Sequence, residues 1–279
     1  MIDIGLNLSS SQFRSDLPEV VTRAIERGVD GFLLTTVDQK SFEINCNLVD
    51  RYSETMRATL GVHPHNAKHW PAFKEAVDID AMLQDWRILS IGECGLDYSR
   101  MNSTRDEQIV ALREQLEIAG EYNLPVFLHL RPYEKDPHGH GEYDLMKDFV
   151  DILEAVNLTA PHKIHGVVHC FTGSTSMLER IVSLGFYVGI TGWVTDTRRG
   201  VPLRQAIPFI PDDRLLIETD APYLKPWNAV SHRNNRRNEP SFLIYVLQEL
   251  ALLRGTSVDE LKVLTNTNFR TLFKWYPGS

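Results

Sequence analysis

The feature that most constrains this chain is a regular succession of short apolar runs and helical patterns along its length. Apolar, β-prone runs lie at residues 2–8, 31–36, 57–61, 88–92, 126–129, 166–169, 186–190 and 215–218. Most of them alternate with segments of helical periodicity, at residues 17–27, 42–52, 73–84, 105–122, 143–156, 176–184 and 203–209. After the last run, helices are expected at residues 240–253, 257–265 and 267–275. Eight strands that alternate with helices in 279 residues predict an α/β fold, a closed (β/α)₈ barrel.

The alternative to a barrel is an open, doubly wound sheet, which binds its ligand at one crevice instead of around a ring. Neither GxGxxG nor GxxxxGK[ST] follows a predicted strand, so a nucleotide cofactor has no support. No internal repeat or linker divides the sequence, and we expect one domain over residues 1–279.

Composition narrows the classes of partner and compartment. The formal net charge of −8 argues against a general grip on duplex nucleic acid, although a bound metal and local cations can still carry a phosphate. No apolar run is long enough to cross a membrane, and the chain begins without a signal region. We therefore expect a cytoplasmic protein, and a monomer because no interface patch is recognisable. The three cysteines include no CxxC pair, which argues against a disulfide framework or a zinc knuckle.

Four of the predicted strands lead into side chains that can bind a metal. These side chains are Glu93, His129, His169 and Asp220. Glycines on both sides of Glu93 leave little side-chain bulk to block a ligand. Each residue taken singly is more often a local hydrogen-bond partner than a ligand. In parallel barrels, however, the carboxyl ends of the strands meet on one side, so the four residues together predict a metal site.

This mixture of carboxylates and imidazoles suits Mg²⁺, Mn²⁺ or Zn²⁺, and without thiolates it gives no particular reason for zinc. A metal held in this way lowers the pKa of a bound water and screens a phosphoryl or carbonyl oxygen, which makes hydrolysis the expected chemistry. Asp220 can hold the metal, orient the attacking water, or both.

Two residues near these strand ends are candidates for substrate contacts. His63, in GVHPH after the third strand, can donate a hydrogen bond to a substrate oxygen or hold a carboxylate. The alternative for His63 is a loop histidine that stabilises the proline turn. Arg131 alternates onto the same side as His129 and can bind a phosphate, or it can form an ion pair that supports the rim.

The segments after the last strands carry basic and aromatic residues. The loop at residues 222–240 contains a basic cluster formed by His232, Arg233, Arg236 and Arg237. Phe171, Trp193 and Tyr223 can stack on nucleic-acid bases, although we expect packing to be the role of at least one of them.

With these residues in hand, the chain resembles a known family. The segments DIGLNLSSSQF, GVHPH, IGECGLDY, LPVFLH, VVHCFTG, ITGWV, LLIETDAPYL and RRNEP are similar, in order and nearly end to end, to the TatD family of metal-dependent deoxyribonucleases. That family is an amidohydrolase-like branch of the TIM barrels. The resemblance implies a cytoplasmic, divalent-metal-dependent phosphodiesterase that acts on DNA. It also implies 3′-to-5′ activity on single strands, typically with Mg²⁺.

Carried over motif by motif, the resemblance implies metal ligands at Glu93 of ECGLDY, His129 of LPVFLH, His169 of VVHCFTG and Asp220 of ETDAPYL. It makes His63 of GVHPH a contact of the substrate or of the attacking water.

The chain departs from the family pattern at two places. Many members open with HxH, which supplies two imidazoles to a second metal, whereas Gly5 and Asn7 stand at those positions here. This GxN form resembles the subgroup of TatD proper. Asn7 can offer an amide oxygen to a metal or its water, or it can only order the strand end, and we expect one firmly held ion. The second departure is a longer segment at residues 131–141, which can reshape the substrate groove.

The leading hypothesis is a metal-dependent DNase in which Asp220 and His63 take part in catalysis. Contacts to the substrate are expected from Asn7, Arg131, Arg236 and Arg237. One alternative is a hydrolase of a small ester or amide, or of an aminoacyl-tRNA, because barrels host many chemistries on the same kind of site. Another is a non-catalytic binding protein that has lost the histidines of the first strand.

Overall fold

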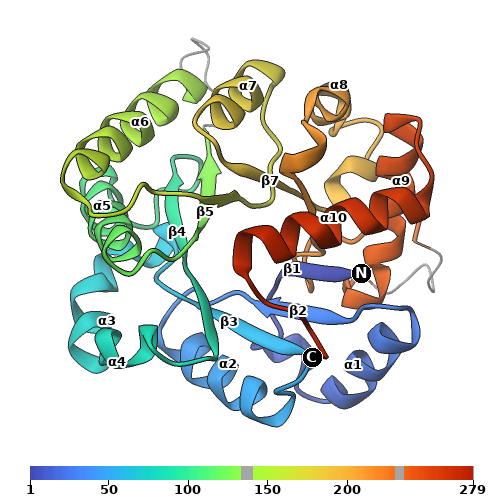
Figure 1. Ribbon diagram of the computed structural model, residues 1–279, viewed down its shortest axis with the longest axis horizontal. Helices are drawn as coiled ribbons and strands as arrows, with labels where there is room; N and C mark the ends of the chain where they lie inside the picture. The colour runs from blue at the N-terminus through green and yellow to red at the C-terminus, as the bar shows by residue number, and fades with distance from the viewer. Residues whose placement is uncertain (133–140, 230–235, 279) are drawn as a thin grey trace. The chain divides into compact units, whose positions relative to one another are not determined.

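The computed structural model describes residues 1–132, 141–229 and 236–278, of which residues 141–143 are described by their backbone alone. Parallel strands form one sheet in the order β1 to β8, with helices between them (Figure 1). The strands are β1 (Ile2–Leu6), β2 (Gly31–Leu34), β3 (Met56–Leu60), β4 (Ile88–Asp97), β5 (Val126–Arg131), β6 (Gly166–Val168), β7 (Tyr187–Ile190) and β8 (Leu215–Ile217). This order and alternation confirm the predicted TIM-type (β/α)₈ class.

The helices follow the strands along the chain. The α-helices are α1 (Leu17–Glu26), α2 (Gln39–Arg51), α3 (Trp70–Ala76), α4 (Ile79–Leu83), α5 (Arg105–Tyr122), α6 (Gly141–Thr159), α7 (Thr175–Ser183), α8 (Val201–Ala206), α9 (Leu243–Arg254) and α10 (Val258–Phe273). Short 3₁₀ helices lie at η1 (Ser11–Phe13), η2 (Pro64–His69), η3 (Gly192–Thr195), η4 (Ile207–Phe209), η5 (Asp212–Arg214) and η6 (Pro240–Phe242).

By their contacts the residues group into two compact units. We call Thr35–Asp50 with Arg57–His169 the central unit, and Met1–Leu34 with Arg51–Met56 and Cys170–Ser279 the terminal unit. The single domain predicted over residues 1–279 stays a prediction.

In the central unit, β4 extends further than the sequence predicts. The expected strand ends at Gly92 and leaves Glu93 beyond it, which is wrong, because β4 continues pairing with β5 as far as Asp97 opposite Arg131. Gly95 makes this possible. It has a φ of +146°, and a Cβ there would lie 1.9 Å from the carbonyl oxygen of His129. The glycine therefore allows the backbone of β5 to approach closely. We had expected the missing side chain to leave room for a ligand.

Helices α5 and α6 lie side by side against β4 and β5 in the central unit (Figure 1). Helix α5 begins at a capping box between Thr104 and Glu107 and ends at Asn123, which is left-handed. The helix predicted at residues 73–84 is in fact two helices. Its break falls at Val77, and the Asp78 carboxylate caps α4 by accepting from the Ala81 N–H at 3.1 Å.

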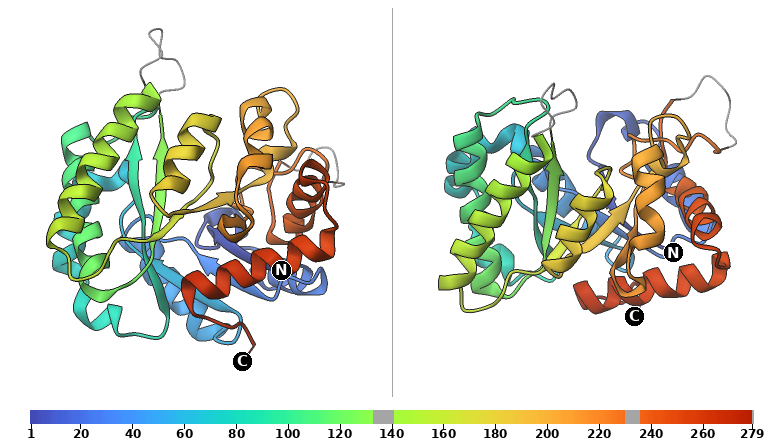
Figure 2. Two further views of the ribbon diagram at one scale, coloured as in Figure 1. Left: turned by 45° about the horizontal axis from the view of Figure 1, so that its top comes forward. Right: turned by 90° about the horizontal axis from the view of Figure 1, so that it is seen from above.

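In the terminal unit, α10 packs against β8 and β1 and is seen clearly in the views of Figure 2. Two helices are predicted here, at residues 257–265 and 267–275, but the structure has one. Thr265 and Thr267 lie where the two predicted helices meet, and their hydroxyls donate to carbonyls one turn earlier, at Leu261 and Val263, inside the continuous helix. None of the helices in the described ranges is both long and apolar enough to span a bilayer.

Candidate functional site

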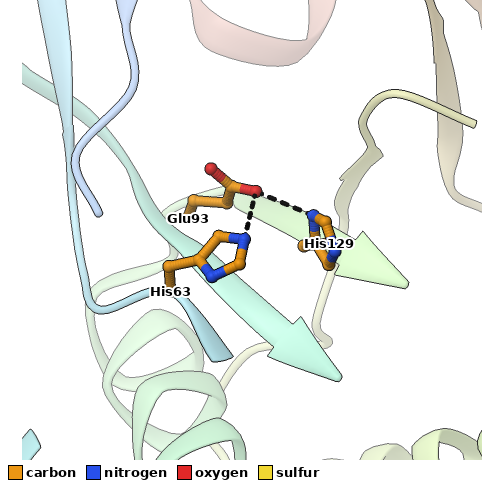
Figure 3. A group of neighbouring side chains, drawn as sticks. All are labelled: His63, Glu93 and His129. Carbon is orange, nitrogen blue, oxygen red and sulfur yellow. Dashed lines mark hydrogen bonds and ion pairs between the residues drawn. The ribbon is translucent and has the colours of Figure 1, made fainter. Parts of the chain in front are cut away.

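One carboxylate oxygen gathers three imidazoles in the central unit. Glu93 Oε1 lies 2.7 Å from His169 Nε2, 2.9 Å from His129 Nδ1 and 3.2 Å from His63 Nε2. Glu93 sits on β4, His129 on β5, His169 directly after β6 and His63 after β3, so consecutive strands supply the group. Figure 3 shows the rings of His63 and His129 converging on the Glu93 carboxylate. Ligand atoms of His63, Glu93 and His129 all lie within 4.8 Å of one another, close enough to hold one ion.

The charge balance of this cluster depends on burial. Burial alone would raise the pKa of Glu93, but the surrounding imidazoles of His63, His169 and His129 outweigh it and hold the pKa well below its usual range. Burial lowers the pKa of His63 to about 4, although Glu93 pulls it upwards. At neutral pH, Glu93 is therefore ionised and His63 is neutral.

The hydrogen bonds of His63 decide where its proton lies. Its Nδ1 accepts from the His65 N–H at 3.0 Å, at the start of η2. A neutral imidazole that accepts at Nδ1 carries its proton on Nε2, and that nitrogen faces Glu93. His63 thus acts as a hydrogen-bond donor here. It also stabilises the proline turn and contacts the Glu93 carboxylate, while its contact with a substrate stays a prediction.

His129 is bracketed by two carboxylates of the same strand. Besides Glu93 at Nδ1, it contacts Asp97 Oδ2 through Nε2 at 3.3 Å. Burial would lower the pKa of His129, but Asp97 and Glu93 raise it above its usual value. Asp97 also meets His65 Nε2 at 2.6 Å, and its other oxygen accepts from the Ser99 and Arg100 N–H groups.

Sequence reasoning missed Asp97 as a site residue. The signal was available, because Glu93, Gly95 and Asp97 alternate onto one face of a strand. The predicted strand ends at Gly92, so Asp97 lies outside it and its alternation with Glu93 is not recognised. Burial would raise the pKa of Asp97, but its bonds to His129 and His65 depress it strongly.

Two buried glutamines of α5 position the backbone next to these residues. Gln115 accepts from the Val62 N–H at 2.8 Å and donates to the Val62 carbonyl at 3.3 Å, which fixes the segment that carries His63. Gln108 makes the same pair of bonds with Asp97, accepting at 2.8 Å and donating at 3.2 Å. They lie seven residues apart and so share a helix face. Neither glutamine is marked by any motif in the sequence.

The other predicted site residues, Asp220 and Asn7, meet in the terminal unit. Asn7 Nδ2 donates to Asp220 Oδ1 at 2.9 Å. Asp220 has a φ of +53°, and its N–H donates to the Gly5 carbonyl at 2.8 Å. The amide of Asn7 therefore orients a carboxylate that is itself a candidate ligand, which neither role expected for Asn7 had included.

Buried polar groups hold Asp220 in this conformation through Thr219. The Asp3 carboxylate accepts from the Thr219 N–H at 2.9 Å and from its hydroxyl at 2.5 Å. Asn238 donates to the Thr219 carbonyl at 2.8 Å. Asp3 is fully buried, and burial raises its pKa to about 8 even though the Thr219 bonds oppose the shift.

The predicted phosphate contacts differ in their surroundings. Arg237 donates to both oxygens of Asp16 and to Glu239, and its guanidinium lies 5.0 Å from the Phe13 ring centroid. The structure thus gives Arg237 a role in the terminal unit that needs no substrate. Arg236 beside it is exposed, and Arg131 is half-buried at the end of β5. His232, Arg233 and most of the 131–141 segment lie outside the described residues.

The three aromatic residues predicted to stack on bases differ in their exposure to solvent. Phe171 is buried, which confirms packing as its role. Trp193 is half-buried in η3, and Tyr223 is exposed in the loop that follows Asp220. The exposed Trp227 of the same loop was not singled out in the sequence.

A (β/α)₈ chain that collects imidazoles around a carboxylate on consecutive strands falls in the class of metal-dependent hydrolases. The family model of the TatD related DNases matches residues 2–274, and the chain belongs to that family. This confirms the resemblance seen in the motifs. The GxN detail of the first strand stays a prediction.

Named relatives cover nearly the whole chain. A protein of Salmonella typhimurium named 3′-5′ ssDNA/RNA exonuclease TatD is 42% identical over 275 residues, with 98% of this chain and 99% of the relative covered. The protein of the same name from Escherichia coli is 41% identical over 273 residues, covering 98% of each. Among solved structures, a TatD homologue from Escherichia coli superposes with a TM-score of 0.83 at 27% identity, covering 99% of this chain and 98% of that one.

Proposed function

We propose that this protein is a divalent-metal-dependent exonuclease that removes nucleotides from the 3′ ends of single-stranded DNA. Family membership and the names of relatives that align end to end support a nuclease. The relatives' name includes RNA, so we extend the proposal to single-stranded RNA as a second substrate. The acidic net charge of −8 favours a short, frayed strand end over a wrapped duplex.

The observation that carries the proposal is the spacing around Glu93 Oε1. Its distances to the nitrogens of the two proposed histidine ligands are 2.7 Å for His169 Nε2 and 2.9 Å for His129 Nδ1. Neighbouring ligands of an octahedral ion with bonds of about 2.1 Å lie about 3 Å apart, so these atoms fit the edges of a coordination shell. We propose Glu93, His129, His169 and Asp220 as the metal ligands.

The chain's own groups then have distinct roles. A bound divalent ion would supply charge that activates water and screens the scissile phosphate. His63 is neutral and protonated at Nε2, which faces Glu93 in the substrate-free protein; we propose that this proton turns to a phosphate oxygen or to the attacking water when the substrate binds. Asp97 fixes the orientation of the His129 ring, as carboxylates commonly do for metal-binding histidines. Asn7 holds Asp220 in place.

Loss of a label from the 3′ end of a single-stranded oligonucleotide tests this function. The wild-type protein should release the label with added divalent metal and stop when the metal is chelated. His129→Ala should abolish release, whereas His162→Ala, an exposed histidine before β6, should match the wild type. Full activity of His129→Ala would overturn the site, and cleavage of esters but not of DNA would favour the alternative hydrolase.

The identity of the ion is part of the same proposal. We propose Mg²⁺. Mn²⁺ and Zn²⁺ are the alternatives, because imidazole ligands also suit these ions. Titration of the metal-free protein with each ion, followed by label release, ranks them. The predicted cytoplasmic location and monomeric state stay predictions, and light scattering on the purified protein measures the second.

A further inference from the structure

We propose that the terminal unit carries a stacking platform for the bases of a single strand, formed by Trp193 and Trp227 with Arg199 over both rings. This rests on the proposed nuclease function and names the residues that would hold the bases rather than the phosphates. We call these three residues the tryptophan platform.

The geometry of the platform is that of two indoles sharing one guanidinium. Arg199 Cζ lies 4.6 Å from the ring centroid of Trp193 and 6.0 Å from that of Trp227. Trp227 is 68% exposed and the side chain of Arg199 is 62% exposed, so both present surface to solvent. The Arg199 side chain is held in place, because its Nε donates to the buried Asp196 carboxylate at 2.7 Å.

Two segments that follow neighbouring strands are locked together to build this surface. Trp193 belongs to η3 after β7, and Trp227 lies in the loop after β8. The Trp227 N–H donates to Thr195 Oγ1 at 2.7 Å. A Cβ at Gly192 would lie 2.2 Å from the Leu224 carbonyl oxygen, so only glycine permits this approach. The rings are thus held in place before any ligand arrives, which limits the entropy lost on binding.

The surroundings favour a nucleic acid strand as the occupant. Tyr223 N–H donates to the Asp220 carbonyl at 2.9 Å, so the platform's loop begins at a proposed metal ligand. Arg198 beside Arg199 is exposed, and its guanidinium forms no hydrogen bond or ion pair with any residue that the structure describes. The exposed indole of Trp227 and the half-buried indole of Trp193, next to the positive charge of Arg198, suit a chain that alternates flat bases with phosphates. A duplex keeps its bases stacked inside and offers no such faces.

The test is equilibrium binding of a fluorescent oligodeoxyadenylate with phosphorothioate linkages, which resists hydrolysis, in the presence of Mg²⁺. Trp227→Leu should weaken binding about tenfold, as expected when one base loses its stacking partner. Trp227→Phe should keep most of the affinity, because it retains an aromatic face.

Trp86 supplies a matched control. Arg57 lies 4.6 Å from its ring centroid, the same distance as that from Arg199 to Trp193, and Trp86 is 52% exposed. It precedes β4, at the amino end of a strand, where barrel enzymes do not place their substrates. Trp86→Leu should leave both binding and cleavage unchanged.

A strand with abasic sites separates stacking from other causes. Trp227→Leu and the wild type should bind the abasic strand with equal affinity, since there is no base left to stack. Equal weakening on intact and abasic strands, or wild-type affinity of Trp227→Leu for the intact strand, would overturn the platform. If the wild-type protein cleaves single strands while either result holds, the proposed function stands without the platform. If it neither binds nor cleaves them, both fail.

Discussion

The two carboxylates proposed as metal ligands are held in opposite ways. Glu93 in the central unit is contacted by the imidazoles of His129, His169 and His63. Asp220 in the terminal unit is held by the Asn7 amide and by a left-handed backbone anchored through Thr219. The first arrangement depends on charge and the second on neutral hydrogen bonds and burial.

This difference indicates what a metal would change in each region. Because the pKa of His129 is raised, an ion bound at its Nδ1 would take the place of a proton and exchange one positive partner of Glu93 for another. The hydrogen bonds of Asp220 to the Asn7 amide and to the Gly5 carbonyl tie its position to the fold of the terminal unit.

The largest effect is expected from Glu93→Gln. The amide keeps the shape but removes the charge that the imidazoles share, so label release should fall by about 100-fold or more. Addition of divalent metal should also no longer raise the thermal unfolding midpoint, as it should for the wild type. Exonuclease assays and thermal scans measure both. Activity within tenfold of wild type would mean that Glu93 is not a ligand.

The next effect concerns Asp3, which holds Thr219 next to Asp220, and the pH dependence of the protein's stability. Burial on folding raises the pKa of Asp3 to about 8 from its ordinary value of 3.8. Between those values the folded state keeps a proton that the unfolded state has lost. Raising the pH through this window should therefore destabilise the metal-free protein, by at most about 1.4 kcal/mol per pH unit, until the pKa is passed.

Asp3→Asn removes this titration, so its free energy of unfolding should change less between pH 6 and pH 8 than that of the wild type. Urea unfolding at several pH values measures the difference. Parallel pH profiles for the two proteins would show that Asp3 is ionised in the folded state.

A smaller effect is expected from Gln108→Met. The change leaves the Asp97 N–H and carbonyl without their side-chain partner and loosens the carboxylate that orients His129. Activity should fall roughly tenfold, and stability by about 1–3 kcal/mol. Gln115→Met is the matched comparison, because it releases the segment of His63 and leaves Asp97 in place. Wild-type activity of Gln108→Met at reduced stability would limit the glutamine to a structural role.

The smallest effect on activity is expected from Arg237→Ala. Its guanidinium is already engaged by Asp16 and Glu239, so label release should stay within about twofold of wild type while stability falls by about 1 kcal/mol. Arg236→Ala, at the exposed neighbour, should leave stability unchanged and weaken oligonucleotide binding. A large loss of binding in Arg237→Ala with normal stability would restore the phosphate contact predicted from sequence.

The fold class and the residues around Glu93 follow from local sequence patterns. Each strand is predicted by a short apolar run. Each proposed metal-binding side chain lies within such a run or shortly after it. What local patterns could not give is register. The sequence does not show that β4 and β5 pair as far as Asp97 and Arg131, so Asp97 was left out of the site.

Distant partners explain the other differences. Arg237 belongs to a basic cluster in sequence, and only the folded chain brings Asp16, more than two hundred residues away, to its guanidinium. Gln108 and Gln115 are ordinary helix residues until α5 turns them towards Asp97 and Val62. Polar residues that act on a distant backbone leave no periodic signal.

The lack of a side chain at Gly95 determines how the site around Glu93 responds to substitution. With the His129 carbonyl 1.9 Å from where a methyl group would stand, even alanine must push β5 outward. The spacing between β4 and β5, which carry Glu93 and His129, therefore depends on the absence of a side chain at Gly95. A single added carbon there would widen the donor set while leaving every donor intact.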